Sequence, residues 1–472
     1  QLQLFILKGV LADLGPDFRT SVPRNMLAVP KSTGISEGYM RPGDGIVHFV
    51  NGPGVCRGAI VWQGQLVMVM GRNLVVILKD GTVKDFGTLP GSGLVRMDYG
   101  FDRLAIAAGG KLFYFNGVNA TEVTDADLGS VVDMLWIDGY YMTTDGEFIV
   151  VTDLSNPYAV NPLKYGSSEA SPDPIVALLR IRGEVYAVNR YTIEVFGNTG
   201  STGFPFARIP GAQVTRGAIG TRAACVFMGS IAFLGGGRDE APSVYLMVGQ
   251  EAQPIATREV EDIIRGYPEE ILARVHMEVK ADRRHQHLYI HLPDRTLVFD
   301  GAASQVVGEH VWSELSSTLD PASVGAYRCR HIIRAYDKWM CADSSTARVG
   351  ELVDTVSSHW GEEVGWRLDA GIIYNNGKDG VVHSIEIAGL TGRVPLTADP
   401  EVWTSYSTDG VTWSQERSTP AGKQGEMHKR IAWRRCGRIG QWRVQRFRGT
   451  SEAHLAIARI EADIEPIGGV GG

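Results

Sequence analysis

The chain contains 472 residues, of which 44% are hydrophobic and 21% are charged, and its formal net charge is −7. A chain of this length exceeds what one hydrophobic core supports, so we predict two or three domains. The composition is that of a folded protein and excludes a largely disordered one. The negative charge excludes a general nucleic-acid-binding protein, so any basic surface must be local.

The cysteines are spread along the chain without any Cys-x-x-Cys pair, which argues against a disulfide framework and against a structural zinc site. No apolar run approaches the roughly 18 residues of a membrane span. The first residues, QLQLFILKGVLADLG, lack the basic region of a signal peptide. We therefore expect a soluble protein that folds in a reducing cytoplasm. The five cysteines are Cys56, Cys225, Cys329, Cys341 and Cys436.

Residues 1–56 are rich in proline and glycine and contain only a few strand-like runs. They predict a flange or platform segment that precedes the first regular domain.

Residues 57–355 repeat one pattern, in which short β-rich runs are joined by Asp-Gly, Asn-Gly or Gly-Gly turns. The spacing is roughly 40 to 45 residues, the period of a four-stranded propeller blade. Seven units fit, but the last is weak and leaves six as an alternative. We predict an all-β propeller of six or seven blades, because radial closure protects the strand edges. The clearest hairpin turns are Asp80-Gly81, Asn116-Gly117 and Asp145-Gly146.

One helical insertion, at about residues 253–274, separates the fifth unit from the sixth. Val260, Ile263 and Ile264 are spaced as on one helix face, and Pro268 opens a second short helix. Insertions of this kind often bind partners, because they extend from one face of the scaffold. The candidate interface residues here are Arg258, Glu259, Asp262 and Arg265.

The segment RRHQHLYIHLP is the best candidate for metal binding. In a strand, His285, His287 and His291 point to one face, and Leu288, Ile290 and Leu292 point to the other. A catalytic zinc site also needs a third ligand in register and an open position. An ordinary half-exposed strand explains the pattern, and we predict neither a metal site nor a cofactor.

Residues 360–472 alternate apolar and polar positions, which predicts a second all-β domain, a C-terminal β-sandwich. Within it, YSTDGVTWSQE resembles the Asp-box turn of sialidases, but one residue is missing between Asp409 and Gly410. The motif occurs once and lies outside the repeats, so we predict a two-residue Asp-Gly hairpin. The repeats also lack a recurrent acidic pair, and we predict no enzymatic activity.

The segment between Lys429 and Arg448 contains eight lysine or arginine residues and no acidic one. It fits either a solvated strand face or a contact with nucleic acid or an acidic protein surface. Trp433, Trp442 and Phe447 alternate as core residues do, which argues against base stacking. The candidate interface or channel residues are Lys429, Arg430, Arg434, Arg435, Arg438 and Arg443.

Several phrases, in order along nearly the whole chain, resemble the packaged-DNA stabilisation proteins, also called tail hub or nozzle proteins, of short-tailed Salmonella-type bacteriophages (podoviruses). PIATREVEDIIRGY followed by HLYIHLPDRTLVFD is the most specific pair. The others are RNMLAVPK, GSGLVRMDYG, APSVYLM, STDGVTWSQE and KRIAWRRCGRIG. The Gly-rich end IEPIGGVGG has no counterpart that we can place.

This resemblance implies a structural virion protein that is assembled in the host cytoplasm. It implies a homohexameric ring below the portal and its adaptor ring, which continues the DNA channel and retains the packaged DNA. The implied partners are the tail needle or plug and the tailspikes or tail fibres, without membrane insertion. The alternative is a carbohydrate-binding or sialidase-like propeller, whose blades would carry recurrent Asp-boxes or clustered acids.

Overall fold

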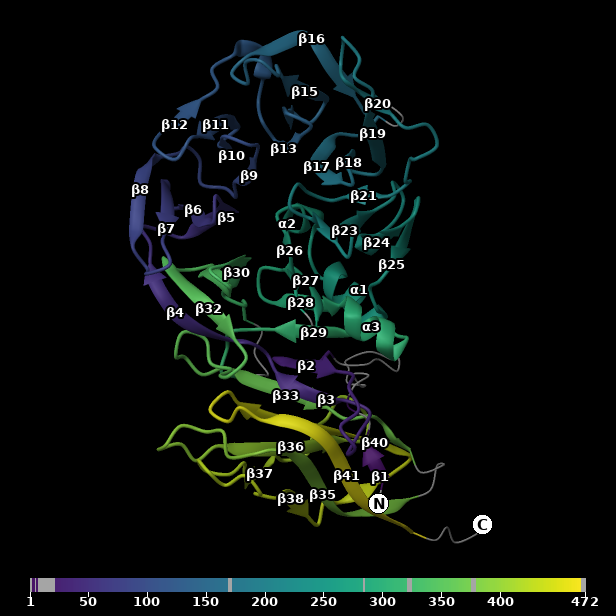
Figure 1. Ribbon diagram of the computed structural model, residues 1–472. Coiled ribbons are helices and arrows are strands. Elements are labelled where there is room, and N and C mark those ends of the chain that lie inside the picture. The colour runs from purple at the N-terminus through teal and green to yellow at the C-terminus, as the bar shows by residue number, and fades with distance from the viewer. Residues whose placement is uncertain are drawn as a thin grey trace.

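The computed structural model describes residues 2–4, 6, 22–168, 172–282, 285–320, 325–374 and 379–467. Figure 1 shows a ring of small sheets at the top and a second group of strands below it. The ring is a β-propeller and the lower group is a β-sandwich, as the sequence predicts. None of the helices among the described residues has the length and apolar character of a membrane span.

The propeller has seven blades in the described part of the chain, and each is an antiparallel sheet. Their first strands lie side by side around the axis, from β5 through to β30 and back to β5. The first three blades consist of β5 (Cys56–Trp62), β6 (Gln65–Met70), β7 (Asn73–Ile77) and β8 (Val83–Thr88); β9 (Arg96–Tyr99), β10 (Leu104–Ala108), β11 (Lys111–Phe115) and β12 (Ala120–Glu122); and β13 (Asp133–Ile137), β14 (Tyr140–Thr144), β15 (Phe148–Thr152) and β16 (Val160–Ser167).

The next three blades consist of β17 (Ile175–Ile181), β18 (Glu184–Asn189), β19 (Ile193–Asn198) and β20 (Phe206–Arg208); β21 (Gly217–Ala218), β22 (Ala224–Phe227), β23 (Ser230–Gly236), β24 (Ser243–Val248) and β25 (Glu251–Pro254); and β26 (His276–Ala281), β27 (Gln286–His291), β28 (Thr296–Asp300) and β29 (Trp312–Leu315). The seventh consists of β30 (Cys329–Ala335), β31 (Lys338–Asp343), β32 (Arg348–Val353) and β4 (Gly45–Asn51).

The hairpin turns form where the sequence predicts them. Gly81, Gly117 and Gly146 have φ angles of 87°, 94° and 104°, a region that glycine enters without steric cost. In the first of these turns Asp80 Oδ1 accepts a hydrogen bond from the Thr82 amide at 2.9 Å. Asp145 does the same for the amide of Phe148 at 2.8 Å. Local turn chemistry therefore sets the register of these blades.

The seventh blade closes the ring with a strand from near the N-terminus. Strand β4 pairs with β32, so that Gly45 lies opposite Val353 and Asn51 opposite Arg348. This explains why the last repeat is weak in the sequence, since only three of its four strands follow the sixth blade. The prediction of a separate flange at 1–56 is wrong, because the described part of this segment is divided between the two domains.

The sandwich also draws strands from both ends of the chain. One sheet has the order β2-β3-β41-β35-β38, with β1 on β41 and β39 on β35; the other has the order β33-β40-β36-β37, with β34 on β40. The strands of the first sheet are β1 (Leu2–Leu4), β2 (Met26–Val29), β3 (Tyr39–Pro42), β35 (Gly380–Leu390), β38 (Ile431–Arg434), β39 (Arg438–Ile439) and β41 (Ala456–Pro466). Those of the second are β33 (Gly365–Asp369), β34 (Ile373–Tyr374), β36 (Glu401–Ser407), β37 (Arg417–Pro420) and β40 (Trp442–Thr450).

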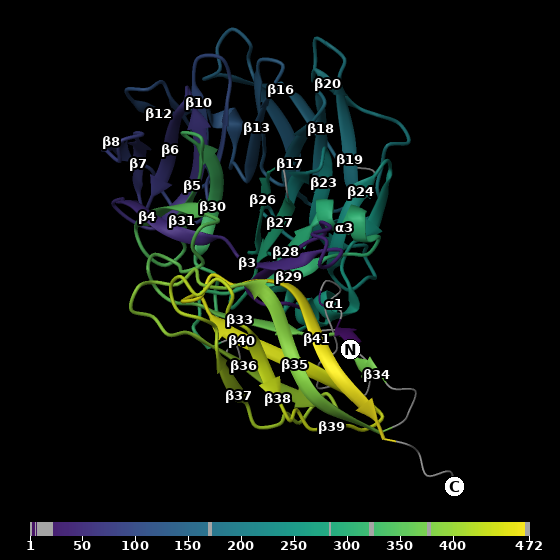
Figure 2. The same cartoon turned by 60° about the horizontal axis from the view of Figure 1, so that its bottom comes forward.

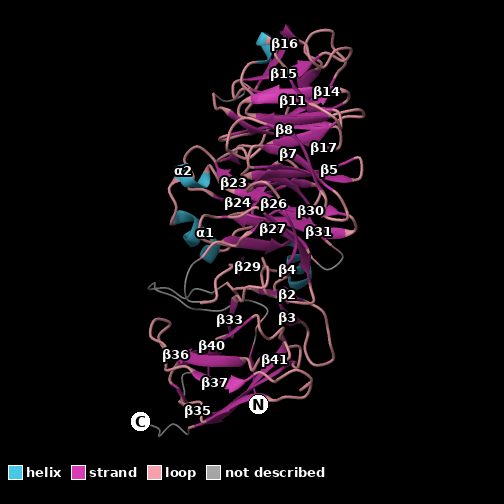
Figure 3. Ribbon diagram, turned by 90° about the vertical axis from the view of Figure 1, so that its left-hand side faces the viewer, coloured by secondary structure: helices cyan, strands magenta, loops and turns pink. Residues whose placement is uncertain are grey.

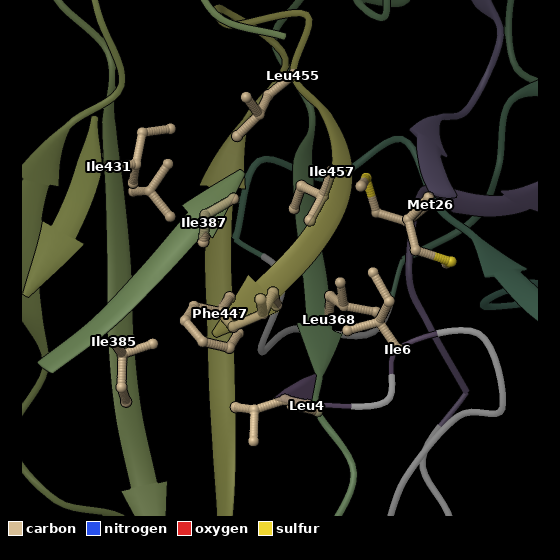
Figure 4. Packing of buried hydrophobic residues seen from close by; sticks show 14 of the residues in the cluster. Leu4, Ile6, Met26, Leu368, Ile385, Ile387, Ile431, Phe447, Leu455 and Ile457 are labelled. Atoms are coloured by element: carbon tan, nitrogen blue, oxygen red, sulfur yellow. The ribbon is translucent and has the colours of Figure 1, made fainter. Parts of the chain in front are cut away.

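The sandwich core packs between these two sheets, which Figure 2 shows from below. Figure 4 shows Phe447 and Leu368 of one sheet facing Ile387 and Ile457 of the other, with Met26 at the edge. The short helix α3 (Gly301–Val307) of the sixth blade adds Ala303 to this core. The two domains therefore share buried apolar surface.

Residues 23–25 join the domains by backbone pairing. Arg24 exchanges two hydrogen bonds of 3.0 Å with Arg367 in β33, and the Asn25 amide donates to Glu314 O in β29 at 2.8 Å. The buried Asn25 side chain donates to Ser316 O and Gly365 O at 3.0 and 2.7 Å. Because one extended segment bonds to both domains, blade six and the sandwich form a continuous sheet.

Candidate functional site

The predicted helical insertion lies between the fifth and sixth blades. Helices α1 (Arg258–Arg265) and α2 (Glu269–Leu272) project from one side of the propeller in Figure 3. Val260 and Ile264 are fully buried and join the core between these blades, so the helical spacing seen in the sequence is a packing pattern. Glu269 in α2 forms an ion pair of 2.9 Å with Arg190 of blade four.

The candidate residues of the insertion lie on the outer side of α1. Arg258 and Arg265 are exposed, whereas Glu259 and Asp262 are partly buried. Arg265 pairs with Asp262 at 3.3 Å on the same helix. The insertion thus presents a mixed-charge surface, anchored by its apolar face.

Three basic residues of the 429–448 segment pair with acidic residues on the sandwich. Arg446 binds Asp369 with two hydrogen bonds of 2.8 and 2.9 Å, and its guanidinium lies 3.6 Å from the centre of the Trp413 ring. Arg448 binds Glu416 and lies 4.7 Å from the centre of the Trp403 ring. Arg430 is 78% exposed and binds Glu386 at 2.5 Å. These pairs neutralise part of the charge that the sequence concentrates here.

Arg443 differs from the prediction that it faces a partner or channel, because its side chain is fully buried. It donates to Cys436 O at 2.6 Å and to Gln445 Oε1 at 2.7 Å, and it lies 3.8 Å from the centre of the Tyr406 ring. Burial lowers the pKa of Arg443. Residue alternation places Arg443 on the side of β40 that carries Phe447, which is the core side.

Four residues of the segment remain as an exposed basic surface: Lys429, Arg434, Arg435 and Arg438. Among the described residues none of the four forms an ion pair with a carboxylate. Arg435 has a positive φ of 56° at the end of β38, and its amide donates to His383 O at 2.6 Å. These four residues lie in and beside β38 and β39, and Lys429 is next in sequence to the paired Arg430.

The histidines of β27 are buried, so the prediction of a half-exposed strand is wrong. A central strand of a blade packs against a neighbouring blade on each face, which leaves neither face to solvent. His285 Nδ1 lies 2.5 Å from Asp300 Oδ2, and Arg41 Nε donates to His285 Nε2 at 3.3 Å. With the neighbouring guanidinium on its second nitrogen, His285 is poorly placed to bind a metal cation together with His287 and Asp300.

Arg41 belongs to a buried ion cluster at the junction of the domains. Asp44 accepts from Arg41 at 2.8 Å and from Lys280 of blade six at 2.5 Å. Burial alone would raise the pKa of Asp44, but the two cations hold it well below its ordinary value. These groups stabilise the junction. They could not be predicted as a cluster from the sequence, because they are far apart along the chain.

The Asp-Gly turn at 409–410 is wider than the predicted two-residue hairpin, because β37 resumes only at Arg417. Asp409 Oδ1 accepts from the amides of Val411 and Thr412 at 2.8 and 2.7 Å, and Ser407 Oγ accepts from the Gly410 amide at 2.8 Å. The Asp409 carboxylate also accepts from the Ser407 and Thr412 hydroxyls, so its hydrogen bonds stay within the loop. The turn is a structural element of the sandwich.

Sequence profiles of two families match the chain domain by domain. The profile described as "Bacteriophage P22 Gp10, beta-propeller" matches residues 2–357, and "Bacteriophage P22 Gp10, beta-sandwich" matches residues 365–465. The chain belongs to the bacteriophage P22 Gp10 family.

A curated relative agrees with this assignment. The chain is 30% identical over 460 residues to "Tail hub protein gp10" of Salmonella phage P22, covering 93% of this chain and 94% of that protein. Solved structures similar to this Gp10-family chain include the Pan2 WD40 domain of Neurospora crassa, with a TM-score of 0.42, 10% identity and coverage of 66% of this chain and 95% of that one. Kluyveromyces lactis Hsv2 gives a TM-score of 0.37, 12% identity and coverage of 71% and 95%. Structural similarity of this size does not bear on function.

Sequence reasoning missed one group of charged residues of this Gp10-family protein, those on the propeller axis. Arg57, Arg96 and Arg330 stand at or next to the first residue of β5, β9 and β30. When the repeats are aligned at their first strands, these three arginines fall at similar positions. This alignment was sufficient to detect the group from the sequence.

Proposed function

We propose that this protein is the tail hub of a short-tailed bacteriophage, a structural protein of the virion without a catalytic role. The observation that carries the proposal is the match of both domains, over 93% of the chain, to a relative named tail hub protein. The protein is assembled in the host cytoplasm and ends in the phage tail.

In this proposal six copies form a ring below the portal and its adaptor ring, and the ring continues the DNA channel. The hub retains packaged DNA, receives the tail needle or plug and carries the tailspikes or tail fibres. A cyclic ring needs two different patches on each subunit. The continuous sheet through residues 23–25 supports this role, because it holds two domains with different surfaces at a fixed angle.

The test of this role is to prepare particles without the protein. We expect such particles to package DNA and then to lose it, and to retain it when purified protein is added back. Negative-stain images should show the protein as a ring on a preformed portal–adaptor complex and as separate subunits without it. Particles that stay full and infectious without the protein would contradict the proposal.

The exposed basic surface contacts a neighbouring subunit or another tail protein. A channel that must let DNA slide cannot bind it tightly, and each phosphate contact adds about one released counterion to the affinity. The pairing of Arg430, Arg446 and Arg448 with carboxylates supports a modest residual charge. The exposed arginines of α1 are a second contact surface in this proposal.

The double variant Arg434→Glu with Arg435→Glu tests the first surface. We expect it to lower incorporation into particles, without changing DNA release from those particles that do form. Lys79→Glu with Lys84→Glu, on the exposed edge of the first blade, is the matched charge control. Normal incorporation of the Arg434/Arg435 variant together with altered DNA retention would assign these arginines to the channel instead.

Hydrolytic activity provides a separate test. We expect no cleavage of sialosides, polysaccharides or peptides, because Asp409 is committed to its own loop and no second carboxylate is placed beside it in the described residues. Cleavage that disappears in Asp409→Asn would favour the sialidase-like alternative.

A further inference from the structure

A cavity of about 620 Å³, bordered by α2, lies at the propeller axis and shares part of its lining with a second cavity of about 180 Å³. Arg57, His276 and His331 line both, and they come from β5, β26 and β30 of three blades. The first strands of the blades surround the axis in Figure 1, so these side chains converge on one space from separate sheets.

The arginines around this space differ in their partners. Arg96 pairs with Asp133 at 2.9 Å, but Arg57, Arg222 and Arg330 form no ion pair among the described residues. Arg57 donates to Gly93 O, Gly71 O and Pro90 O at 2.7 to 3.1 Å, and Arg330 donates to Tyr327 O and Cys329 O at 2.6 and 3.0 Å. Carbonyl oxygens orient a guanidinium group without cancelling its charge.

Glu278, the acidic residue in the lining of the smaller cavity, bonds to other groups of the linings and acts on Arg330 by its charge without forming an ion pair with it. Its Oε1 lies 2.6 Å from His291 Nε2, and its Oε2 accepts from the Ile332 amide at 2.7 Å. Burial and the neighbouring Arg96 guanidinium lower the pKa of Arg222, and the charge of Asp133 offsets them only in part. A lowered pKa in a cation means that its charged form is destabilised, as expected where a counter-ion is missing.

Three histidines, His276, His291 and His331, also line the larger cavity. The rings of His276 and His331 lie 5.1 Å apart, and His276 Nδ1 is buried without a hydrogen-bond partner. His331 has a φ of 55°, within a register shift between Arg330 and Ile333 of β30. The strained backbone holds this imidazole beside His276 and the arginines, and a buried polar atom without a partner is costly unless a ligand supplies one.

We propose that the axial cavities bind a multiply charged oxyanion of the phosphate class, held by Arg222 and Arg330 with hydrogen bonds from the two histidines. Guanidinium groups bind such oxygens with strong, directional hydrogen bonds. The volume excludes a nucleic-acid duplex. The His276, Glu278 and His291 ligand atoms lie within 4.8 Å of one another, but three guanidinium groups nearby that form no ion pair among the described residues oppose a divalent cation.

The experiment measures the thermal midpoint of the full chain against inorganic phosphate and pyrophosphate, with sodium chloride added to keep the ionic strength constant. A bound anion stabilises the folded state with a saturating dependence on its concentration. We expect saturation in the wild type and at least about tenfold weaker binding in Arg222→Gln. Arg334→Gln, an exposed position on the same strand as Arg330, should bind as the wild type does.

Arg222→Gln has a second expected effect: without phosphate its midpoint should lie above that of the wild type, because an unpaired charge has been removed. His276→Gln provides an independent variant if Arg222→Gln does not fold, and it should also weaken binding. Equal midpoints in phosphate and chloride, or wild-type affinity in the folded variants, would overturn the proposal. A saturating rise with Zn²⁺ that is lost in His276→Gln would replace it with a metal site.

Discussion

The propeller and the sandwich are both built of antiparallel strands, but they are assembled in different ways. In the propeller, strands that follow one another pair with one another, and only β4 reaches across the chain. In the sandwich, β41 pairs with β1, β3 and β35, so one sheet joins the first and last parts of the chain. Pairing between strands that are close in sequence allows a domain to be predicted from its sequence. Pairing between strands that are distant in sequence couples the two domains.

The strongest test of this difference compares two buried aspartates. Asp44→Ala leaves Arg41 without its partner at the junction and Lys280 with the more distant Asp282, at 3.5 Å, and Asp133→Ala leaves Arg96 without its partner inside the propeller. We expect each variant to lose about 3–5 kcal/mol of unfolding free energy. Hydrogen exchange should show loosening of both domains in Asp44→Ala, and loosening of the propeller alone in Asp133→Ala. The same exchange pattern in both would contradict a coupling role for the junction.

Acid should weaken the junction between the domains. The folded-state pKa of Asp44 and that of Asp300 lie below the ordinary value, despite burial, because of Arg41 and Lys280 in one case and of His285 and His287 in the other. The contribution of these two aspartates to the unfolding free energy is fully present at a pH above about 3.9, the ordinary pKa of aspartate. It is lost as the pH falls towards their lowered pKa values in the folded state.

We therefore expect the thermal midpoint to fall between about pH 5 and pH 2, with a shallower fall in Asp44→Asn. Calorimetry across this range measures both slopes. An unchanged slope in the variant would mean that other carboxylates carry the acid sensitivity.

A smaller effect is expected from two buried asparagines. Asn25 bonds to both domains, whereas Asn189 bonds within the propeller to Ser168, 21 residues earlier, and to Thr192, at 2.7 and 3.0 Å. Replacing either by alanine should cost about 1–3 kcal/mol, since buried groups lose their partners. Only Asn25→Ala should raise the susceptibility of the sandwich to limited proteolysis. Asn25→Asp, which keeps one oxygen acceptor for the Ser316 amide, separates this bond from the two donated ones.

The smallest effect is expected from exposed ion pairs, which lie outside the coupling network in both domains. Arg430→Gln breaks the pair with Glu386 on the sandwich, and Lys111→Gln breaks a pair of 2.7 Å with Glu122 on the second blade. Neither should change the thermal midpoint measurably, because solvent screens such pairs. A clear loss in either would show that surface charge contributes to the fold.

The sequence predicts the propeller well because its signals are local. Asp80-Gly81 and Asp145-Gly146 each predict a turn from two adjacent residues, and the spacing of Val260 and Ile264 predicts one face of a helix. The strands β1 to β4 were missed as strands of the two domains, since nothing near them indicates partners hundreds of residues away. For the candidate site, the alternation of residues between Arg443 and Phe447 was sufficient to predict that Arg443 is buried. The carboxylates that pair with Arg446 and Arg448 come from other parts of the chain, so the sequence near these arginines does not indicate them.

The placement of β4 has a consequence for how the protein is made. This strand is synthesised about 300 residues before β32, its partner. At roughly 5–20 residues per second, the nascent chain carries an unpaired strand for tens of seconds. The ring of blades closes only after β32 has been made, and the first sandwich sheet only after β41. A chain that stops before β32 therefore displays neither finished domain.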